Sequence, residues 1–271
     1  MPAYLGQHFL YQPKYLNQII ESANLSQKDL VLEIGAGTGS LTEKIIKKAG
    51  FTISVEIDQD LAESLKQKFK NQKNIKIIQG DFLKIDFQLK KILQTSSFKN
   101  FKILGNLPYY ITGKILRKIT ELRSYFGASL KTSVLLVQKE VGEKICHLEK
   151  NSILSLSIKI FGKPKLRGIV PSQAFTPPPQ VDSVILKIDF FNQNTVGTGH
   201  CPVPTFFFRL IKIGFSAPRK MLKNNLKNGL GLSEIEIKNQ LKKAGILENA
   251  RAEDLKLKEW MKLLEILNCE I

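Results

Sequence analysis

Residues Leu30-Val31-Leu32-Glu33-Ile34-Gly35-Ala36-Gly37-Thr38-Gly39 form an apolar run that enters a turn rich in glycine. Glycine adopts backbone conformations that other residues avoid, so three glycines in five positions predict a tight turn. The next residues, Leu41-Thr42-Glu43-Lys44-Ile45-Ile46, favour a helix. The order strand, turn, helix is typical of the first unit of a doubly wound α/β fold.

A second β-type run, residues 51–56, ends on Glu56. In nucleoside-binding βαβ units, a carboxylate at this place accepts hydrogen bonds from ribose hydroxyls, so we expect a bound nucleoside. Glu33 would repel a pyrophosphate, whereas it tolerates S-adenosylmethionine, which carries a sulfonium and an ammonium and no phosphate. The turn and Glu56 alone leave a nicotinamide-dependent oxidoreductase open. Ser40, however, stands where the dinucleotide fingerprint has its third glycine.

A third run, residues 75–81, ends on Asp81, where an adenine edge could be read. A fourth run, residues 101–105, is followed by the most distinctive turn of the chain. That turn reads Asn106-Leu107-Pro108-Tyr109. The Asn106 side-chain oxygen can accept from an exocyclic amine, and Tyr109 can stack on a ring. The turn therefore suits a flat base that bears an amine.

These four features follow four consecutive predicted strands. In an open α/β sheet, ligands bind beyond the carboxyl ends of the strands. We therefore expect one pocket to hold a nucleoside cofactor and a target base together.

The sequence resembles the small-subunit (16S) ribosomal RNA adenine N6-dimethyltransferases over nearly its whole length. Five motifs carry the resemblance: Leu5-Gly6-Gln7-His8-Phe9-Leu10, Glu33-Ile34-Gly35-Ala36-Gly37-Thr38-Gly39, Asn106-Leu107-Pro108-Tyr109, Gln138-Lys139-Glu140-Val141 and Phe175-Thr176-Pro177-Pro178-Pro179-Gln180-Val181-Asp182-Ser183. Two places depart from the family pattern. His8 stands where many relatives have Asn, and Ala36-Gly37-Thr38 replaces the commoner Pro-Gly-Leu. Both changes keep a small turn and a polar side chain. They leave open what His8 contacts, but they do not alter the expected cofactor.

The resemblance implies a class I S-adenosylmethionine-dependent methyltransferase fold. This is an α/β architecture with a doubly wound, mostly parallel sheet and a small C-terminal all-α domain. The implied activity is dimethylation of the exocyclic N6 amine of two adjacent adenosines in small-subunit ribosomal RNA during small-subunit biogenesis. S-adenosylmethionine is the expected cofactor, no metal is expected, and the expected partner is the immature small ribosomal subunit.

The resemblance also implies roles for individual residues. Those expected to bind the cofactor are Gln7, His8, Leu10, Gly35, Gly37, Glu56, Asp81, Phe82 and Asn106. Those expected to hold the target base are Asn106, Leu107, Pro108, Tyr109 and Phe175. In this arrangement Phe175 is the second face of an aromatic clamp against Tyr109. Gln138 and Lys139 are expected near the RNA entrance.

The charge of the chain points to a polyanionic partner. It carries 41 Lys and Arg against 24 Asp and Glu, a formal net charge of +17. Residues 205–229 hold six cations and no acidic residue: Arg209, Lys212, Arg219, Lys220, Lys223 and Lys227. We expect Arg209, Arg219, Lys220 and Lys223 to contact RNA phosphates.

We expect a catalytic domain over residues 1–192, a linker over residues 192–204 and a helical RNA-binding domain over residues 205–271. Residues 177–179 are three prolines, which make a stiff loop at the end of an extended segment, residues 165–180. The remaining patterns predict helices over 113–126 and 139–148 and strands over 132–137, 154–161 and 181–190.

Other features set limits on the protein. Cys146, Cys201 and Cys269 are too widely spaced for a zinc ribbon and odd in number, so we interpret them as reduced. The sequence has no 18-residue apolar run and no basic-then-apolar leader. We therefore expect a cytoplasmic monomer that has no membrane partner.

Two further functions remain as alternatives. One is a large-subunit ribosomal RNA adenine methyltransferase that confers antibiotic resistance; residues 177–179 and 219–226 argue against it because they resemble the small-subunit enzymes. The other is a ribosome-assembly factor whose binding role outweighs catalysis. The intact Asn106 and Tyr109 weigh against lost catalysis.

Overall fold

The computed structural model describes residues 7–85, 91–92, 98, 100–147, 150–192 and 205–268. Several residues of the sequence analysis lie outside these ranges: Leu5, Gly6, Leu148, Cys201, Cys269 and residues 193–204 of the expected linker. Within the ranges, none of the helices has the length and apolar character needed to cross a membrane.

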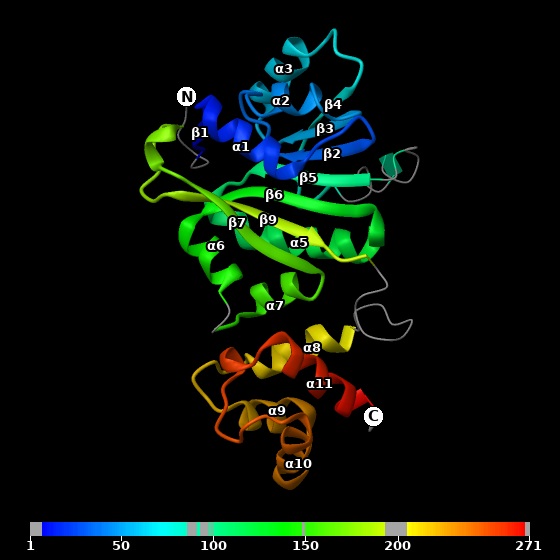
Figure 1. The fold of residues 1–271 in the computed structure, drawn as a ribbon, viewed down its shortest axis with the longest axis vertical. Coiled ribbons are helices and arrows are strands. Elements are labelled where there is room, and N and C mark those ends of the chain that lie inside the picture. Colours follow the sequence, from blue (N-terminus) through cyan, green and yellow to red (C-terminus); the bar gives the residue numbers. More distant parts are fainter. Residues whose placement is uncertain are drawn as a thin grey trace. The chain divides into compact units, whose positions relative to one another are not determined.

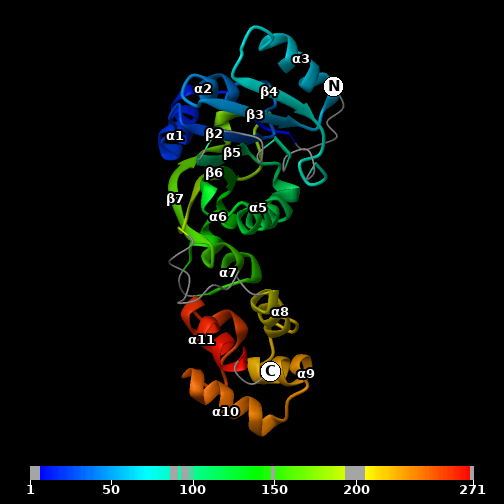
Figure 2. The same cartoon turned by 90° about the vertical axis from the view of Figure 1, so that its right-hand side faces the viewer.

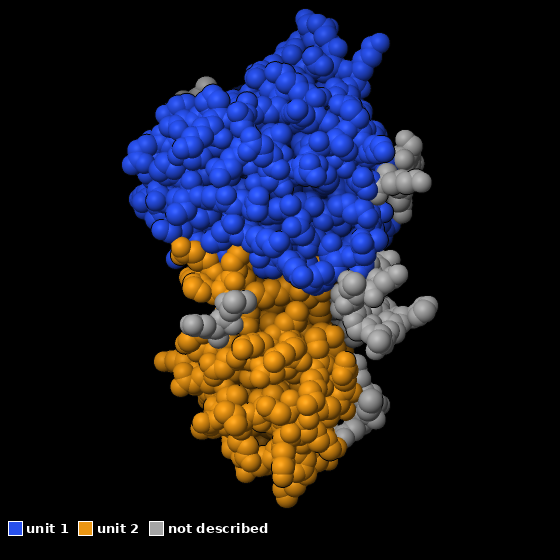
Figure 3. Space-filling view, in the orientation of Figure 1, with its two compact units in different colours: residues 1–142, 162–195 blue, residues 143–161, 196–271 orange. Residues whose placement is uncertain are grey.

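The chain forms two compact units (Figure 3). The first comprises residues 1–142 and 162–195, and the second comprises residues 143–161 and 196–271. Residues 143–161 thus group with the C-terminal helices, although we expected them within a first domain that runs to residue 192. The functional domains 1–192 and 205–271 stay a prediction.

A seven-stranded sheet is the centre of the first unit (Figure 1). Its strand order is β4-β3-β2-β5-β6-β9-β7. The five strands from β4 to β6 in this order run parallel to one another, and β9 is antiparallel to both of its neighbours, β6 and β7. The strands are β2 (Asp29–Ile34), β3 (Phe51–Glu56), β4 (Ile75–Gln79), β5 (Asn100–Asn106), β6 (Leu130–Gln138), β7 (Gly162–Val170) and β9 (Ser183–Phe190). The expected doubly wound, mostly parallel sheet is confirmed.

Helices cover the sheet on both faces (Figure 2). The α-helices that begin in this unit are α1 (Pro13–Ala23), α2 (Thr42–Ile46), α3 (Gln59–Lys68), α5 (Thr112–Phe126) and α6 (Lys139–Cys146), and the 3-10 helices are η1 (Tyr109–Ile111), η2 (Gly127–Ser129) and η3 (Ser172–Ala174). All six residues of β2 are buried, as a central parallel strand requires. Leu16 and Ile19 of α1 pack in one apolar cluster with Val31 of β2 and Leu104 of β5.

The second unit is helical. Its elements are α7 (Ile153–Lys159), α8 (Thr205–Gly214), α9 (Leu222–Leu230), α10 (Glu234–Ala244), η5 (Ala252–Asp254) and α11 (Leu257–Asn268). Trp260 and Phe207 are fully buried in it. Asn151 explains why residues 143–161 belong here, because its backbone N–H donates to the Glu253 carbonyl at 2.8 Å and its side-chain amide donates to the Leu255 carbonyl at 3.0 Å.

The predicted strand over residues 154–161 is wrong. Apolar residues alternate with polar ones in this segment, which is the pattern of a strand, but the structure forms α7 there. Ser152 and Ser155 exchange hydrogen bonds in a capping box, which satisfies free N–H groups at the helix start. The Ser157 hydroxyl donates to the Ile153 carbonyl at 2.7 Å, so its polar group is also satisfied within the helix.

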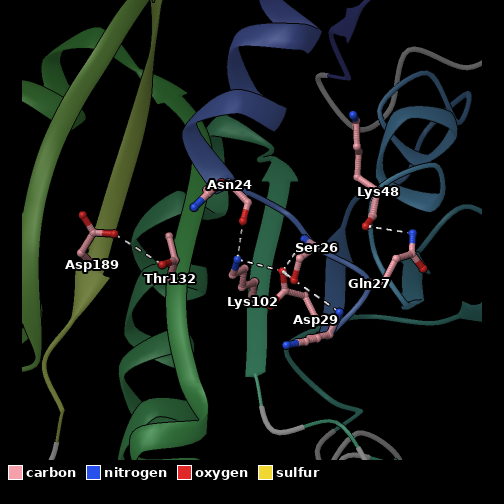
Figure 4. A network of polar contacts seen from close by, with 9 residues as sticks. Asn24, Ser26, Gln27, Asp29, Lys48, Lys102, Thr132 and Asp189 are labelled. Carbon is pink, nitrogen blue, oxygen red and sulfur yellow. Dashed lines mark hydrogen bonds and ion pairs between the residues drawn. The ribbon is translucent and has the colours of Figure 1, made fainter.

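A buried ion pair joins the amino ends of β2 and β5 (Figure 4). Lys102 donates to the Asp29 carboxylate at 2.9 Å and to the Asn24 carbonyl, at the end of α1, at 2.7 Å. The same carboxylate oxygen accepts from the backbone N–H of Ser26 at 2.6 Å. The network therefore fixes α1 and the loop after it against the two central strands.

Removal of Asp29 should destabilise the protein strongly. Asp29→Ala leaves the Lys102 ammonium buried and unpaired, and we expect the free energy of unfolding to fall by about 3–5 kcal/mol. Urea denaturation measures the change. The double variant Asp29→Ala, Lys102→Met should recover much of the loss because it removes both charges. Equal losses in the single and double variants would contradict this account.

Candidate functional site

A pocket with about 810 Å³ of empty space lies at the carboxyl ends of the central strands. It brings together residues that follow β2, β3, β4 and β5, as the strand pattern predicts. They are joined by the N-terminal segment before α1. The lining residues are Gln7, His8, Phe9, Ile34, Gly35, Gly37, Val55, Glu56, Ile57, Gly80, Asp81, Phe82, Leu83, Asn106, Leu107, Pro108, Tyr109, Tyr110, Ile111 and Ile115.

Glu56 is fixed by backbone N–H groups. One carboxylate oxygen accepts from the N–H of Gly37 at 2.7 Å, and the other accepts from the N–H of Asp58 at 3.0 Å. Gly37 has a φ of +55°, which is strained for other residues, and a Cβ there would lie 3.0 Å from the Phe9 ring. The turn therefore needs glycine both for its conformation and for the close approach of Phe9.

Glu33 lies beneath the glycine turn and is fully buried. One of its oxygens accepts from the hydroxyls of Thr42 at 2.7 Å and Ser54 at 2.6 Å, and the other has no partner among the described residues. Burial raises the pKa of Glu33 from 4.5 to about 7; the two hydroxyls act against this rise, and the charge of Glu56 adds to it.

The N-terminal segment is held over the pocket by the segment that precedes β9. Strand β1 (Phe9–Leu10) pairs antiparallel with β8 (Phe175–Thr176). The His8 Nδ1 lies 2.8 Å from the Pro177 carbonyl, to which it donates as N–H. These contacts keep the backbone of His8 at the mouth of the pocket.

Asn106 is oriented by this same segment. Its side-chain amide nitrogen donates to the His8 carbonyl at 2.7 Å. The Oδ1 atom of the amide has no donor among the described residues, so it remains available as an acceptor. The Leu107 carbonyl is likewise without a donor in the part of the chain that the structure describes. The adjacent Pro108 carbonyl accepts from the N–H of Ile111 at 3.3 Å.

Tyr109 forms one wall of the pocket. Its hydroxyl lies 2.6 Å from the Ser183 hydroxyl, and its ring lies beside the His8 ring with 5.5 Å between centroids and 31° between planes. Burial raises the pKa of Tyr109. The phenol therefore stays neutral at physiological pH, and the hydrogen bond to Ser183 holds its ring.

Phe175 does not lie with these residues. Its side chain is 2% exposed and packs in the core with Leu10, Leu16 and Ile19, away from the lining of the pocket. The clamp between Phe175 and Tyr109 is not formed in this structure, and the role of Phe175 stays a prediction. Leu10 lines a smaller pocket beside Gly37 and Asn106.

The other predicted residues are placed as follows. Asp81 and Phe82 line the main pocket, and the Asp81 carboxylate accepts from the N–H of Leu83 at 2.9 Å. Gln138 ends β6, and the backbone N–H of Lys139 donates to the Asp182 carbonyl at 3.0 Å. Neither residue lines the pocket, and their contact with RNA stays a prediction.

In the second unit, Arg219 and Lys220 line a basic pocket of their own. Lys223 instead forms an ion pair with Glu248 at 3.6 Å, and Arg209 lies on α8. An ion-paired lysine has less charge to offer a phosphate, so Lys223 is the weakest of the four predicted contacts. The roles of all four stay predictions.

Several residues of the site were not predicted from the sequence, and four of them show why. Phe9, Ile57 and Tyr110 line the pocket, and Ser183 anchors Tyr109. Phe9, Ile57 and Tyr110 each come directly after a predicted residue, namely His8, Glu56 and Tyr109. Their place next to these residues in the sequence was the available signal. The Ser183 contact spans 74 residues, and its only sequence signal was its place at the end of the proline motif.

Comparison with known proteins places this geometry among RNA-modifying enzymes. A family model described as ribosomal RNA adenine dimethylase matches residues 3–269. A Dehalococcoides mccartyi protein named ribosomal RNA small subunit methyltransferase A is 42% identical over 262 residues, which cover 96% of this chain and 86% of that protein. A Fusobacterium nucleatum protein of the same name is 34% identical over 96% of this chain and 95% of that protein.

Two crystal structures resemble the whole chain. A dimethyladenosine transferase from Plasmodium falciparum aligns with a TM-score of 0.74 and 26% identity, over 97% of this chain and 98% of that one. The 23S rRNA methyltransferase ErmE aligns with a TM-score of 0.73 and 24% identity, over 96% and 99% of the two chains. At 24% identity, the second likeness shows the fold alone.

The buried Glu33 should make stability depend on pH. Because its pKa is raised from 4.5 to about 7, folding favours the protonated carboxyl. The stability from this group is present below about pH 4.5 and is lost as the pH rises to about 7. Relative to Glu33→Gln, which mimics the protonated form, the wild type should lose up to about 3 kcal/mol across this window. Urea denaturation of both proteins from pH 4.5 to 8 measures the difference, and a pH-independent difference would contradict the expectation.

Proposed function

This chain belongs to the ribosomal RNA adenine dimethylase family, and from that premise we propose that it methylates adenosine in small-subunit ribosomal RNA. The methyl donor is S-adenosylmethionine, and the acceptor is the exocyclic N6 amine. Each of two adjacent adenosines receives two methyl groups. The observation that carries the proposal is the fixed Asn106 amide, whose oxygen has no donor among the described residues and lies in a pocket that also contains Glu56.

The charges of the pocket fit S-adenosylmethionine. Its described lining contains the carboxylates Glu56 and Asp81 and no lysine or arginine. Such a site suits a cationic ligand without phosphate, and its described lining offers no cationic side chain to the pyrophosphate of a nicotinamide dinucleotide. This argues against an oxidoreductase.

In the proposed complex, different residues of the pocket bind different parts of the cofactor. Glu56 accepts from the ribose hydroxyls, Asp81 and Phe82 frame the adenine, and the turn at Gly35 and Gly37 approaches the amino-acid part. The N-terminal segment with Gln7 and His8 covers the cofactor, and Leu10 supports that cover from the smaller pocket. When bound there, S-adenosylmethionine supplies an electrophilic methyl group on a sulfonium.

Asn106 and Leu107 prepare the amine for methyl transfer. The N6 lone pair is delocalised into the adenine ring, which makes it a poor nucleophile. The Asn106 Oδ1 and the Leu107 carbonyl accept from its two N–H groups and thereby favour a pyramidal nitrogen whose lone pair faces the methyl group. Orientation of this kind can recover roughly 7–11 kcal/mol of a barrier. The proton on the methylated nitrogen leaves to water, so no residue is needed as a general base.

Tyr109 holds the target base by stacking, which is worth about 1–3 kcal/mol per base in single-stranded complexes. A paired base hides its amine, so the target adenosine has to be extruded or lie in a loop.

A large-subunit methyltransferase would use a similar pocket. The full-length relatives at 34–42% identity carry small-subunit names, however, and this favours the small subunit.

Loss of the Asn106 amide should strongly reduce methylation and leave the affinity for the cofactor nearly unchanged. We expect Asn106→Ala to lower turnover by at least about a hundredfold, as removal of a fixed hydrogen-bond partner of a reacting group typically does. The affinity for S-adenosylmethionine should stay within a few-fold. Mass spectrometry of nucleosides from small-subunit precursors detects dimethyladenosine, and calorimetry measures the affinity. Asn71→Ala, at an exposed site after α3, is the matched control. Near-normal dimethylation by Asn106→Ala would refute the assignment.

Loss of the Glu56 carboxylate should weaken the cofactor. A hydrogen bond to a charged acceptor is worth about 1.5–3 kcal/mol, so Glu56→Ala should lower the affinity for S-adenosylmethionine at least about tenfold. RNA binding should change little. Glu63→Ala, an exposed carboxylate on α3, is the control. Calorimetry that finds unaltered affinity in Glu56→Ala would mean that Glu56 only closes the glycine turn.

A further inference from the structure

The second unit contains a polar pocket that the proposed chemistry does not use. It has about 1000 Å³ of open space beside α9. Four cations and three amides make up most of its lining: Arg219, Lys220, Lys227, Arg251, Asn224, Asn228 and Asn249. No acidic residue is among the described residues that line it.

Three of the four cations are available to a ligand. Arg219, Lys220 and Arg251 are exposed, and no ion pair of theirs is found among the described residues. The fourth cation of the lining, Lys227, lies 3.9 Å from Glu234, and Lys223 nearby pairs with Glu248 at 3.6 Å. Three of the four cations in the pocket therefore have no acidic partner among the described residues.

The three amides are also free. Asn224 and Asn228 are four residues apart on α9, so they lie on one helix face, and Asn249 comes from the loop before η5. All three are exposed, and none has a side-chain hydrogen bond among the described residues. Asn225 is different: it is buried, and its amide donates to the carbonyls of Gly214 at 2.6 Å and Ala217 at 3.1 Å. Only the exposed asparagines are therefore free to recognise a partner.

We propose that this pocket binds a ribose–phosphate stretch of RNA and reads its 2′-hydroxyls. The three cations hold the phosphates, and the amides of Asn224, Asn228 and Asn249 hydrogen-bond the 2′-hydroxyls. An amide offers both donor and acceptor, as a 2′-hydroxyl does. The 2′-hydroxyl is what lets a protein distinguish RNA from DNA. The inference rests on the proposed function, which identifies RNA as the partner. It assigns to the second unit a preference for RNA over DNA, which charge alone cannot supply.

Charge and 2′-hydroxyl recognition can be separated by salt. Phosphate contacts release counterions, so their loss flattens the slope of log affinity against log salt by about 0.7–0.9 for each contact. Neutral amides release none. Two triple variants of the full chain therefore serve: Asn224→Ala, Asn228→Ala, Asn249→Ala, and Arg219→Gln, Lys220→Gln, Arg251→Gln.

The experiment measures binding of each protein to an RNA hairpin that carries the target adenosines and to its all-deoxy counterpart, across a range of salt. We expect the asparagine variant to bind the RNA about tenfold or more weaker, the DNA almost unchanged, and the salt slope to be kept. The cation variant should lose affinity for both and flatten the slope by about 2–3. Asn239→Ala, at an exposed site on α10, is the control and should bind as the wild type does.

An unchanged ratio of RNA to DNA affinity in the asparagine variant would overturn the inference, as would a wild type that binds both equally. Methylation by the wild type is measured in parallel. Its absence would refute the proposed function, whereas the change in the affinity ratio between the asparagine variant and the wild type reports on the pocket beside α9. The two failures are therefore distinguishable.

Discussion

The parallel pairing of β2 with β3 on one side and β5 on the other is the constraint on which the pocket depends. It brings the glycine turn, Glu56 and Asn106 to one edge of the sheet, although they are far apart in the sequence. The Gly35 N–H continues this pairing beyond β2, because it donates to the Val55 carbonyl at 2.9 Å. Gly105 allows β5 to lie this close, since a Cβ there would come within 2.5 Å of the Ile34 carbonyl. Backbone geometry therefore sets the positions, and side chains then supply the chemistry.

Two carboxyl groups at this edge differ because their surroundings differ. Glu56 accepts from two backbone N–H groups, which hold its carboxylate in place. Glu33 is fully buried with one oxygen unpartnered, so burial raises its pKa to about 7. A cationic cofactor is compatible with both groups. The electrostatics of the site thus support the same ligand as the family membership does.

The four strand ends could be predicted from the sequence because apolar runs and glycine turns are local signals. Two kinds of feature could not: a segment whose local signals conflict, and features that depend on distant partners. Residues 154–161 alternate as a strand does, yet the Ser152 capping box makes them helical. Phe175 is buried because β8 pairs with β1, 165 residues earlier in the chain. The weakened charge of Lys223 needs Glu248, which only the tertiary fold brings close.

The central claim is that one pocket holds the cofactor and the target adenine together. A crystal structure with a compound that joins adenosine N6 to the methyl position of the cofactor tests it most directly. The account predicts that the ribose hydroxyls of the cofactor half contact Glu56. It also predicts that N6 lies within hydrogen-bond distance of the Asn106 Oδ1 and the Leu107 carbonyl. An adenosine half that lies outside the pocket, with Asn106 unbonded to N6, would contradict it.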